Sequence, residues 1–286
     1  METPSTRAWP QLMGICNITP DSFSDGGAHA DTASALAHAR TLCAAGATII
    51  DVGGESTRPG SDRIGAPAEL ERIADAVQAM VTEGMWVSVD TLHAQTAAHV
   101  LAAGAKAIND VSGGLWEPDI LRVVAEHPQA YYLLGHWRGR PETMNSLATY
   151  ADVLAELKAE LCARIDAAMN AGVRPEQIVL DPGIGFAKNP EHNWEILANL
   201  HQLELGFPLM IGVSRKRFLA DLAWPLAANG NPADAGPHDR DLATAVITAL
   251  LAGQDLWAVR VHDVAASAIA LKQARLLHRY HREPIT

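Results

Sequence analysis

The chain has few of the features that mark secreted, membrane or redox-active proteins. It contains only three cysteines, and Cys16, Cys43 and Cys162 show no spacing typical of a disulfide framework, a metal site or a redox motif. The N-terminus lacks a charged-then-apolar signal pattern, and no apolar run is long enough to span a membrane. From these absences we expect a soluble protein of the cytoplasm.

Positive charge is also scarce. There are 22 Lys and Arg residues against 33 Asp and Glu, which gives a net charge of −11 at pH 7 and argues against binding to nucleic acid or to anionic membranes. Local basic residues could still bind a small anion, and the candidates are Arg215, Lys216, Arg217 and Arg260. With 48% hydrophobic and 19% charged residues, the composition is that of a globular protein with enough apolar material for a core.

What the chain does have is a regular alternation of short apolar runs and helical segments. The runs predict strands at 12–16, 48–52, 86–89, 107–108, 131–134, 177–180, 208–211 and 257–261. The intervening patterns predict helices at 32–45, 66–82, 94–103, 118–126, 150–170, 191–200, 241–251 and 265–280. Gly46, Gly104 and Gly172 mark three of the helix ends. The strands are continuously apolar, as in a parallel sheet that is buried on both faces.

This alternation, with no linker to divide it, predicts an α/β protein with a single (β/α)8 TIM barrel over residues 1–286. About residues 1–11 would form a short N-terminal extension. Long loops are expected after the first strand (17–31), after the second, and after the seventh (223–239). A doubly wound open sheet is the structural alternative, and the number of strands favours the barrel.

Polar side chains follow nearly every predicted strand. In a barrel of parallel strands the C-terminal ends meet at one rim, so these residues become neighbours although they are far apart in sequence. Carboxylates and amides suit a heterocycle with a hydrogen-bonding edge, and basic residues after the last two strands suit a phosphate. We therefore expect an enzyme that acts on a small ligand with one heteroaromatic and one phosphorylated end. The residues at the strand ends are Asn17, Glu55 to Arg58, Asp90, Asn109, His136, Asp181, Ser214 to Arg217, Arg260 and His262.

Some polar residues have structural interpretations that compete with a role in chemistry. Asp110 and Ser112 fit helix caps or turns better than catalysis. We interpret His93, His192 and His238 as surface residues. No cluster of His, Cys or carboxylates has the spacing of a protein metal cage.

Seven segments, in order along the chain, resemble the dihydropteroate synthase family of pterin-binding barrel enzymes. Any one of them could occur by chance, but all seven together are highly specific. The likeness runs from about Leu12 to the last helix. The segments are residues 17–27 (NITPDSFSDGG), 51–60 (DVGGESTRPG), 88–91 (SVDT), 108–114 (INDVSGG), 180–186 (LDPGIGF), 214–218 (SRKRF) and 260–263 (RVHD).

The resemblance implies a transferase of folate biosynthesis. The family joins 6-hydroxymethyl-7,8-dihydropterin diphosphate to p-aminobenzoate and releases 7,8-dihydropteroate and diphosphate, in an SN1-like displacement at the pterin methylene. The resemblance further implies Mg2+ as cofactor, small molecules as substrates, a cytoplasmic homodimer and a sulfonamide target.

By the same resemblance, the site residues divide according to the ligand that they would bind. Asp90, Asn109, Asp181 and Lys216 would bind the pterin, and Asn17, Arg260 and His262 the diphosphate, with Mg2+ on Asn17. The p-aminobenzoate would be bound by Phe23, Thr57, Arg58, Pro59, Phe186 and Arg217. Catalytic roles would fall to Asp25, Arg58 and Lys216.

Two positions depart from many relatives. Gly135 precedes the strand-five histidine where Met is common, which could open or reshape the wall beside the pterin. Arg217 follows the strand-seven lysine where Ser is common, which could alter contacts to p-aminobenzoate.

Two other functions stay open. A methyltetrahydrofolate-dependent methyltransferase would not need Arg260 and His262 as a diphosphate clamp, and a paralogue could bind pterin without catalysis.

Overall fold

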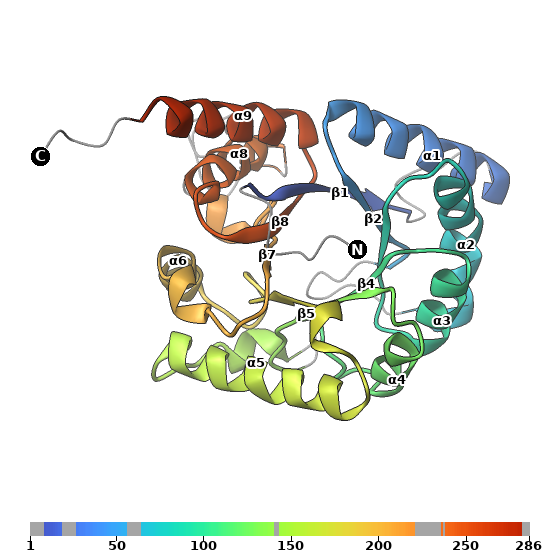
Figure 1. The fold of residues 1–286 in the computed structure, drawn as a ribbon, viewed down its shortest axis with the longest axis horizontal. Helices are drawn as coiled ribbons and strands as arrows, with labels where there is room; N and C mark the ends of the chain where they lie inside the picture. Colours follow the sequence, from blue (N-terminus) through green and yellow to red (C-terminus); the bar gives the residue numbers. More distant parts are fainter. Residues whose placement is uncertain are drawn as a thin grey trace, which may run out of the picture.

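Parallel strands close into a barrel and follow one another around it in the order of the sequence (Figure 1). The computed structural model describes residues 9–18, 27–55, 64–139, 143–220, 236 and 238–281, with the backbone alone for residues 27–31 and 145. Because β8 pairs with β1, the sheet has no open edge, and the barrel is confirmed over the doubly wound alternative. The strands are β1 (Gln11–Asn17), β2 (Ile49–Gly53), β3 (Val87–Asp90), β4 (Ala107–Asp110), β5 (Tyr131–Gly135), β6 (Ile178–Asp181), β7 (Leu209–Ile211) and β8 (Leu256–Val261).

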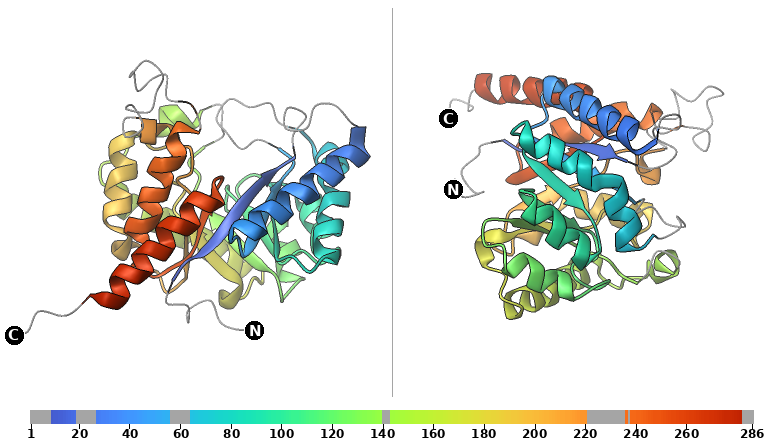
Figure 2. Two further views of the ribbon diagram at one scale, coloured as in Figure 1. Left: turned by 90° about the horizontal axis from the view of Figure 1, so that it is seen from above. Right: turned by 90° about the vertical axis from the view of Figure 1, so that its right-hand side faces the viewer.

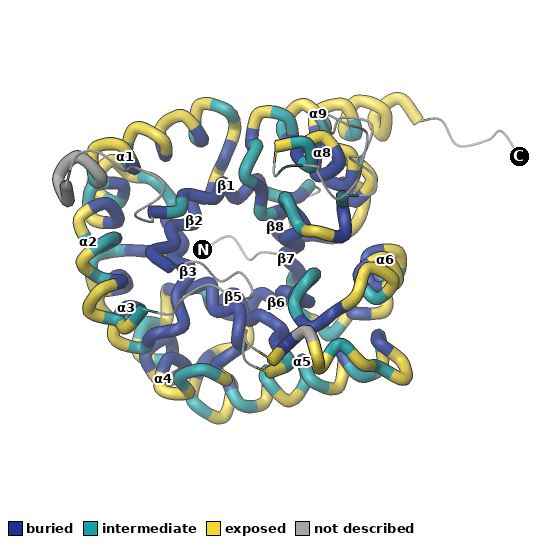
Figure 3. Tube along the Cα trace, turned by 180° about the vertical axis from the view of Figure 1, so that it is seen from behind, coloured by how far each residue is buried: buried dark blue, intermediate teal, exposed yellow. Residues whose placement is uncertain are grey.

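The helices surround the barrel. Figure 3 shows strands that are buried along almost their whole length and helices whose outer sides are exposed. In the left view of Figure 2, α1 and α9 lie on either side of β1, the strand that they both contact. None of the described helices is long and apolar enough to cross a membrane. Their bounds are α1 (Gly27–Ala45), α2 (Ala66–Thr82), α3 (Ala94–Ala102), α4 (Asp119–Ala125), α5 (Val153–Asn170), α6 (Pro190–Ala198), α8 (Asp239–Leu251) and α9 (Val264–Tyr280).

Two helix starts differ from the sequence prediction by three residues or more. Helix α1 begins at Gly27, so the connection after β1 is shorter than the predicted loop 17–31. Helix α5 begins at Val153 rather than at residue 150, because the carboxylate of Asp152 accepts a hydrogen bond from the Ala155 N–H at 2.9 Å and caps the helix there. Tyr150 instead lies beneath the guanidinium of Arg138, 3.9 Å from the ring centroid.

The predicted helix ends are confirmed at three glycines. Gly46, Gly104 and Gly172 follow α1, α3 and α5 and have φ angles of 114°, 103° and 99°. These values lie in the left-handed region that side-chain-bearing residues avoid, and a glycine there reverses the chain without that penalty.

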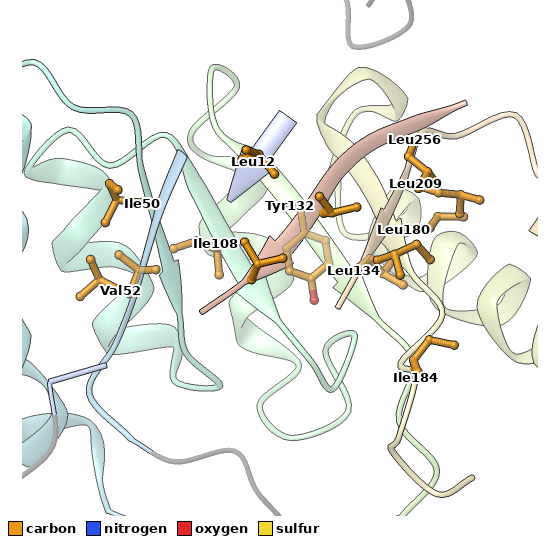
Figure 4. Close-up of a cluster of buried hydrophobic side chains, with 14 of the residues drawn as sticks. Leu12, Ile50, Val52, Ile108, Tyr132, Leu134, Leu180, Ile184, Leu209 and Leu256 are labelled. Carbon is orange, nitrogen blue, oxygen red and sulfur yellow. The ribbon is translucent and has the colours of Figure 1, made fainter. Parts of the chain in front are cut away.

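Strand alternation divides the apolar side chains into two sets. Those that point outward pack against the helices, among them Ile50, Tyr132 and Leu180 in the cluster of Figure 4. Those that point inward fill the barrel, and none of them is more than slightly exposed. The inward set comprises Met13, Ile49, Ala107, Leu133, Val179, Met210 and Ala258, and Trp257 packs against it.

Aromatic rings pack together at the N-terminal end of the barrel. Trp86 lies just before β3, Tyr131 begins β5, and Trp257 is near the start of β8. The ring centroid of Trp86 is 5.9 Å from that of Tyr131 and 6.0 Å from that of Trp257. The centroids of Tyr131 and Trp257 are 5.8 Å apart. These distances are typical of favourable aromatic pairs. The rings thus pack together at this end of the barrel, opposite the C-terminal rim.

Candidate active site

Above the apolar layer, the inward-facing row of the barrel becomes polar. Along β2, β4 and β6 the residue two positions after an inward apolar one is Asp51, Asn109 or Asp181, and alternation keeps it on the inner face. On β8, Arg260 follows Ala258 in the same way. These acidic and amide side chains are almost completely buried, with 0%, 1% and 6% exposure for Asp51, Asn109 and Asp181.

Arg260 at the end of β8 forms ion pairs with carboxylates of two other strands, β2 and β3. Its Nε donates to Asp51 Oδ2 at 2.6 Å, and its Nη2 donates to Asp90 Oδ2 at 2.8 Å. Asn109 Nδ2 donates to the same Asp51 oxygen at 3.0 Å. A carboxylate can only accept, so the Asn109 amide must turn its NH2 toward Asp51 and its carbonyl oxygen away. The network leaves the third guanidinium nitrogen of Arg260 outside both ion pairs.

Three oxygens of this network face no donor. Within the described part of the chain, Asp51 Oδ1, Asp90 Oδ1 and Asn109 Oδ1 are buried and have no hydrogen-bond partner. A buried polar atom without a partner costs about 1–3 kcal/mol, so native proteins rarely keep several together. Acceptors grouped in this way at the C-terminal ends of the strands match a ligand that brings several N–H donors.

Asp181 and Lys216 lie at the ends of neighbouring strands, β6 and β7. Asp181 Oδ1 accepts a hydrogen bond from the Gly183 N–H at 2.8 Å. The ammonium of Lys216 donates to the carbonyl of Ile184 and lies 4.7 Å from the ring centroid of Phe186. The β6–α6 connection is therefore packed directly against Lys216. Lys216, predicted to bind the pterin, is thus a neighbour of Phe186, predicted to bind p-aminobenzoate.

Burial moves the pKa values of these groups toward neutrality. It raises the pKa of Asp90 to about 7 against the opposing charge of Arg260. Burial also raises the pKa of Asp181, and the positive charge of Lys216 offsets only part of this rise. The pKa of Lys216 falls to about 8 because of burial, with Asp181 opposing the fall. The mouth thus contains charged groups that exchange protons near pH 7, as active sites often do.

Asn17 stands at the end of β1, beside Gly53 of β2. A Cβ at Gly53 would lie 3.2 Å from Asn17 Oδ1, so the glycine leaves room for the amide oxygen at the rim. In the described ranges no group of three His, Cys, Asp or Glu residues is arranged to hold a metal ion. A hard cation here would have to take most of its ligands from water and substrate, as Mg2+ commonly does.

The basic turn after β7 does not act as one unit. Arg215 adopts a φ of 59°, and its guanidinium forms a bidentate pair with Asp241 of α8 at 2.7 and 2.8 Å. Arg215 is thus committed to α8, and its prediction as a local anion-binding residue is wrong. Arg217 is exposed. Lys216 instead contacts the β6–α6 connection, through the Ile184 carbonyl and the Phe186 ring.

His262 and Ser214 connect the ends of β8 and β7. The Ser214 hydroxyl lies 2.9 Å from His262 Nδ1 and accepts from the His262 N–H at 3.0 Å. His262 and Arg260 do share the end of β8, as the sequence predicts.

The remaining predicted residues, Phe23, Asp25, Thr57, Arg58 and Pro59, lie outside the described residues.

The structural interpretation of Asp110 is confirmed, whereas that of His93 is wrong. The Asp110 carboxylate accepts from the N–H groups of Ser112 and Gly114, both at 2.8 Å, and so shapes the turn after β4. His93 is 7% exposed and is not a surface residue. Its ring lies 2.7 Å from a Glu117 oxygen and 3.0 Å from the Ile64 carbonyl.

Gly135 does not open the wall of the site. A Cβ at Gly135 would lie 2.5 Å from the Cα of Val111 and 2.6 Å from its carbonyl oxygen. The main chain of the β4–α4 turn therefore occupies the space that a side chain would need.

The sequence prediction missed Asp51 and Lys188. Asp51 is a charged residue inside an apolar strand, two positions after the inward Ile49, and that position was a usable signal. Lys188 is 9% exposed and lies in the β6–α6 connection. A lysine in a loop gives no hint of burial in the sequence.

Fold and site together define a (β/α)8-barrel enzyme with a buried cluster of carboxylate, amide and guanidinium groups at the C-terminal rim. Residues 13–262 match the family model of the pterin binding enzymes. The dihydropteroate synthase of Mycobacterium leprae is 46% identical over 264 residues, covering 92% of this chain and 91% of the relative. The chain belongs to the pterin-binding enzyme family, among its dihydropteroate synthases.

Two solved structures agree over nearly the whole length. The dihydropteroate synthase of Xanthomonas albilineans with 4-aminobenzoic acid has a TM-score of 0.84 and 37% identity, and the match covers 95% of this chain and 94% of that one. The Burkholderia cenocepacia enzyme complexed with 7,8-dihydropteroate has a TM-score of 0.81 and 32% identity, covering 94% and 92%.

Proposed function

We infer that this chain condenses 6-hydroxymethyl-7,8-dihydropterin diphosphate with p-aminobenzoate, giving 7,8-dihydropteroate and diphosphate. One observation carries the inference to this chain's own residues: the three buried acceptor oxygens of Asp51, Asp90 and Asn109 without a donor. The amino-pyrimidine edge of a pterin offers adjacent N–H donors, which are the groups that such a site lacks.

The pterin is proposed to bind inside the barrel mouth. Asp181 accepts a pair of N–H groups from the pterin edge, and Asn109 Oδ1 and Asp90 Oδ1 accept others. Lys216 donates to the carbonyl side of the ring. Support comes from the burial of Asp181 and Asn109 beneath the rim and from the Burkholderia cenocepacia relative, whose structure contains 7,8-dihydropteroate.

The diphosphate is proposed to bind at the ends of β1 and β8. Arg260 keeps one nitrogen outside its pairs with Asp51 and Asp90, and His262 stands two residues further along. The amide oxygen of Asn17 fits Mg2+, which would neutralise the phosphate oxygens when bound. A guanidinium is well suited to phosphate because its N–H groups form paired, charge-assisted hydrogen bonds.

The p-aminobenzoate is proposed to bind between the β6–α6 connection and the connections after β1 and β2. Phe186 would give an apolar wall and Arg217 a counter-charge. Phe23, Thr57, Arg58 and Pro59 would complete the site. The Xanthomonas albilineans relative, solved with 4-aminobenzoic acid, supports a site for this substrate.

The reaction proposed for this arrangement is an SN1-like displacement at the pterin methylene. Positive charge develops on the pterin as diphosphate departs, and the carboxylates around the ring stabilise it without a covalent intermediate. Asp25 would face the developing cation and the incoming amine. We further propose a homodimer that works in the cytoplasm.

The direct test is release of diphosphate with and without p-aminobenzoate. We expect release to depend on both substrates and to yield 7,8-dihydropteroate. A methyltetrahydrofolate-dependent methyltransferase would release no diphosphate under any condition. A paralogue without activity would bind the pterin in calorimetry but leave the diphosphate ester intact.

A further inference from the structure

Lys188 is a buried lysine that none of the proposed substrate contacts uses. It lies in the β6–α6 connection, seven residues after Asp181 in the chain. Its ammonium donates to three acceptors: His136 Nδ1 at 2.9 Å, the Gly183 carbonyl at 3.0 Å and the Phe186 carbonyl at 3.1 Å. An ammonium group has three N–H bonds, and each of them has a partner here.

The two carbonyl partners belong to residues that face different substrates. Gly183 donates its own N–H to Asp181, the proposed pterin carboxylate. Phe186 provides the proposed wall for p-aminobenzoate. One ammonium group thus joins the pterin end of this connection to its p-aminobenzoate end.

The backbone of this connection needs such support. Gly183, Gly185 and Ala187 have φ angles of 64°, 80° and 48°. For Ala187 the left-handed conformation is unfavourable because of its Cβ, and such a residue persists only when its surroundings enforce it. Lys188, the next residue, is anchored back to Gly183 and Phe186 and holds the chain in this shape.

The hydrogen-bond pattern also determines the state of His136. Its Nε2 lies 2.7 Å from a carboxylate oxygen of Glu160 on α5, and its Nδ1 faces the Lys188 ammonium. A carboxylate needs a proton from Nε2, and an ammonium needs the lone pair of Nδ1. Only neutral imidazole with its proton on Nε2 satisfies both partners. Arg138 holds Glu160 from its other side.

We propose that Lys188 is a positioning residue for the transfer reaction: through neutral His136 and Glu160 it fixes the β6–α6 connection so that Phe186 and Asp181 face their two substrates together. The proposal rests on the function proposed above for this site. It assigns Lys188 no contact with either substrate.

The electrostatic surroundings of His136 and Glu160 agree with this arrangement, whereas burial acts against the positive charge of Lys188. Burial and then the Lys188 charge lower the pKa of His136 to about 4, which keeps the ring neutral at pH 7. His136 and Arg138 lower the pKa of Glu160 to about 2, so its carboxylate stays charged. Burial lowers the pKa of Lys188 to about 7, with Asp181 and Glu160 opposing the fall and Lys216 and Arg138 adding to it.

The first experiment measures the state of His136 in the wild-type protein. Long-range 1H–15N spectra of the histidine-labelled chain, assigned with a His136→Gln variant, distinguish the two neutral tautomers from the imidazolium. We expect the Nε2–H tautomer at pH 7 and no protonation down to about pH 5. An imidazolium or an Nδ1–H tautomer at pH 7 would overturn the proposal. This measurement needs no activity, so it stays decisive if the proposed reaction is wrong or if a Lys188 variant does not fold.

The second experiment separates the two substrates kinetically. Lys188→Met keeps the aliphatic length of the side chain and removes its donors, and the exposed Lys158→Met on α5 is the matched control. We expect the kcat/KM for p-aminobenzoate to fall at least about tenfold and pterin affinity to change less than about threefold, since Asp181 keeps Lys216 and its strand position. Kinetic constants equal to those of Lys158→Met would contradict the proposal.

Discussion

At the scale of single residues, the barrel mouth works by matching acceptors to donors, and Asp181 tests that idea. Asp181→Asn preserves volume and can keep an oxygen toward the Gly183 N–H, but it then turns an NH2 group toward the pterin N–H pair. Donors that face donors lose the hydrogen bonds and leave buried groups unsatisfied. We expect pterin affinity to fall by about tenfold or more, or about 1.4 kcal/mol.

Calorimetric titration with the dihydropterin measures this loss. Asp166→Asn, on the exposed side of α5, is the control for the chemical change itself. Wild-type pterin affinity in the Asp181→Asn protein would exclude Asp181 from pterin recognition.

Arg260 has two tasks at the same scale, because it neutralises Asp51 and Asp90 and is proposed to bind diphosphate. Arg260→Ala removes both and leaves two buried carboxylates without a counter-ion. We expect diphosphate affinity to fall by at least about tenfold. The corresponding loss of binding free energy should be a few kcal/mol at most. Arg260 lowers the pKa of Asp90, which stands at about 7, so its loss should raise that pKa further. Asp90 then stays protonated to higher pH, and the acid limb of kcat/KM should move toward alkaline pH.

The measurements are calorimetry with diphosphate and a pH profile of kcat/KM. Arg122→Ala, an exposed arginine of α4, provides the comparison. Unchanged diphosphate affinity would refute the proposed role of Arg260 in diphosphate binding, even if the pH profile of kcat/KM shifts.

At the scale of elements, the sequence predicted the strands and most helices because periodicity and helix-ending glycines are local signals. It also placed Asp90, Asn109, Asp181 and Arg260 at strand ends. It could not predict that Arg260 pairs with Asp51, since that contact joins residues 209 positions apart and depends on closure of the barrel. The strand pattern alone could not distinguish the basic residues after β7, because the left-handed Arg215 redirects the chain there; only the family resemblance singled out Lys216.

The buried His93 gives an element-scale prediction about stability. It stands at the start of α3 and contacts Glu117 and the carbonyl of Ile64, which precedes α2. The carboxylate of Glu55, 3.7 Å from the His93 ring, raises the pKa of His93 from 6.5 to about 9, partly offset by burial. Because the folded pKa lies above the unfolded one, the stabilisation is complete below about pH 6.5 and is lost as pH rises through about 9.

Replacement of His93 should therefore destabilise the protein mainly at low pH. We expect His93→Gln to lower the free energy of unfolding by about 2 kcal/mol at pH 6, with a smaller loss at pH 10. Urea unfolding at both pH values measures the difference, and His99→Gln on the exposed side of α3 is the control. A loss of equal size at both pH values would show that charge on His93 is not the cause.

At the scale of the whole molecule, the barrel brings the two proposed substrate sites into contact at β1 and β2. Asn17 and Gly53, at the ends of these strands, are paired in register. The connections that follow them carry Asp25 and Arg58, which we assign to the p-aminobenzoate side of the reaction. Binding of diphosphate and Mg2+ at Asn17 should therefore be coupled to binding of p-aminobenzoate, since both involve the same pair of strand ends.

This coupling predicts an order of binding. The free protein should bind p-aminobenzoate poorly, and pterin, diphosphate and Mg2+ together should raise its affinity by at least about tenfold, within the usual range of coupling between sites. Chelation of Mg2+ by EDTA should abolish the increase and stop turnover. Asp25→Ala and Arg58→Ala should lower turnover strongly while pterin binding stays nearly intact, which separates them from Asp181→Asn. Equilibrium titration with p-aminobenzoate decides the question: equal affinity for the free protein and for the pterin–diphosphate complex would mean that the two sites are independent.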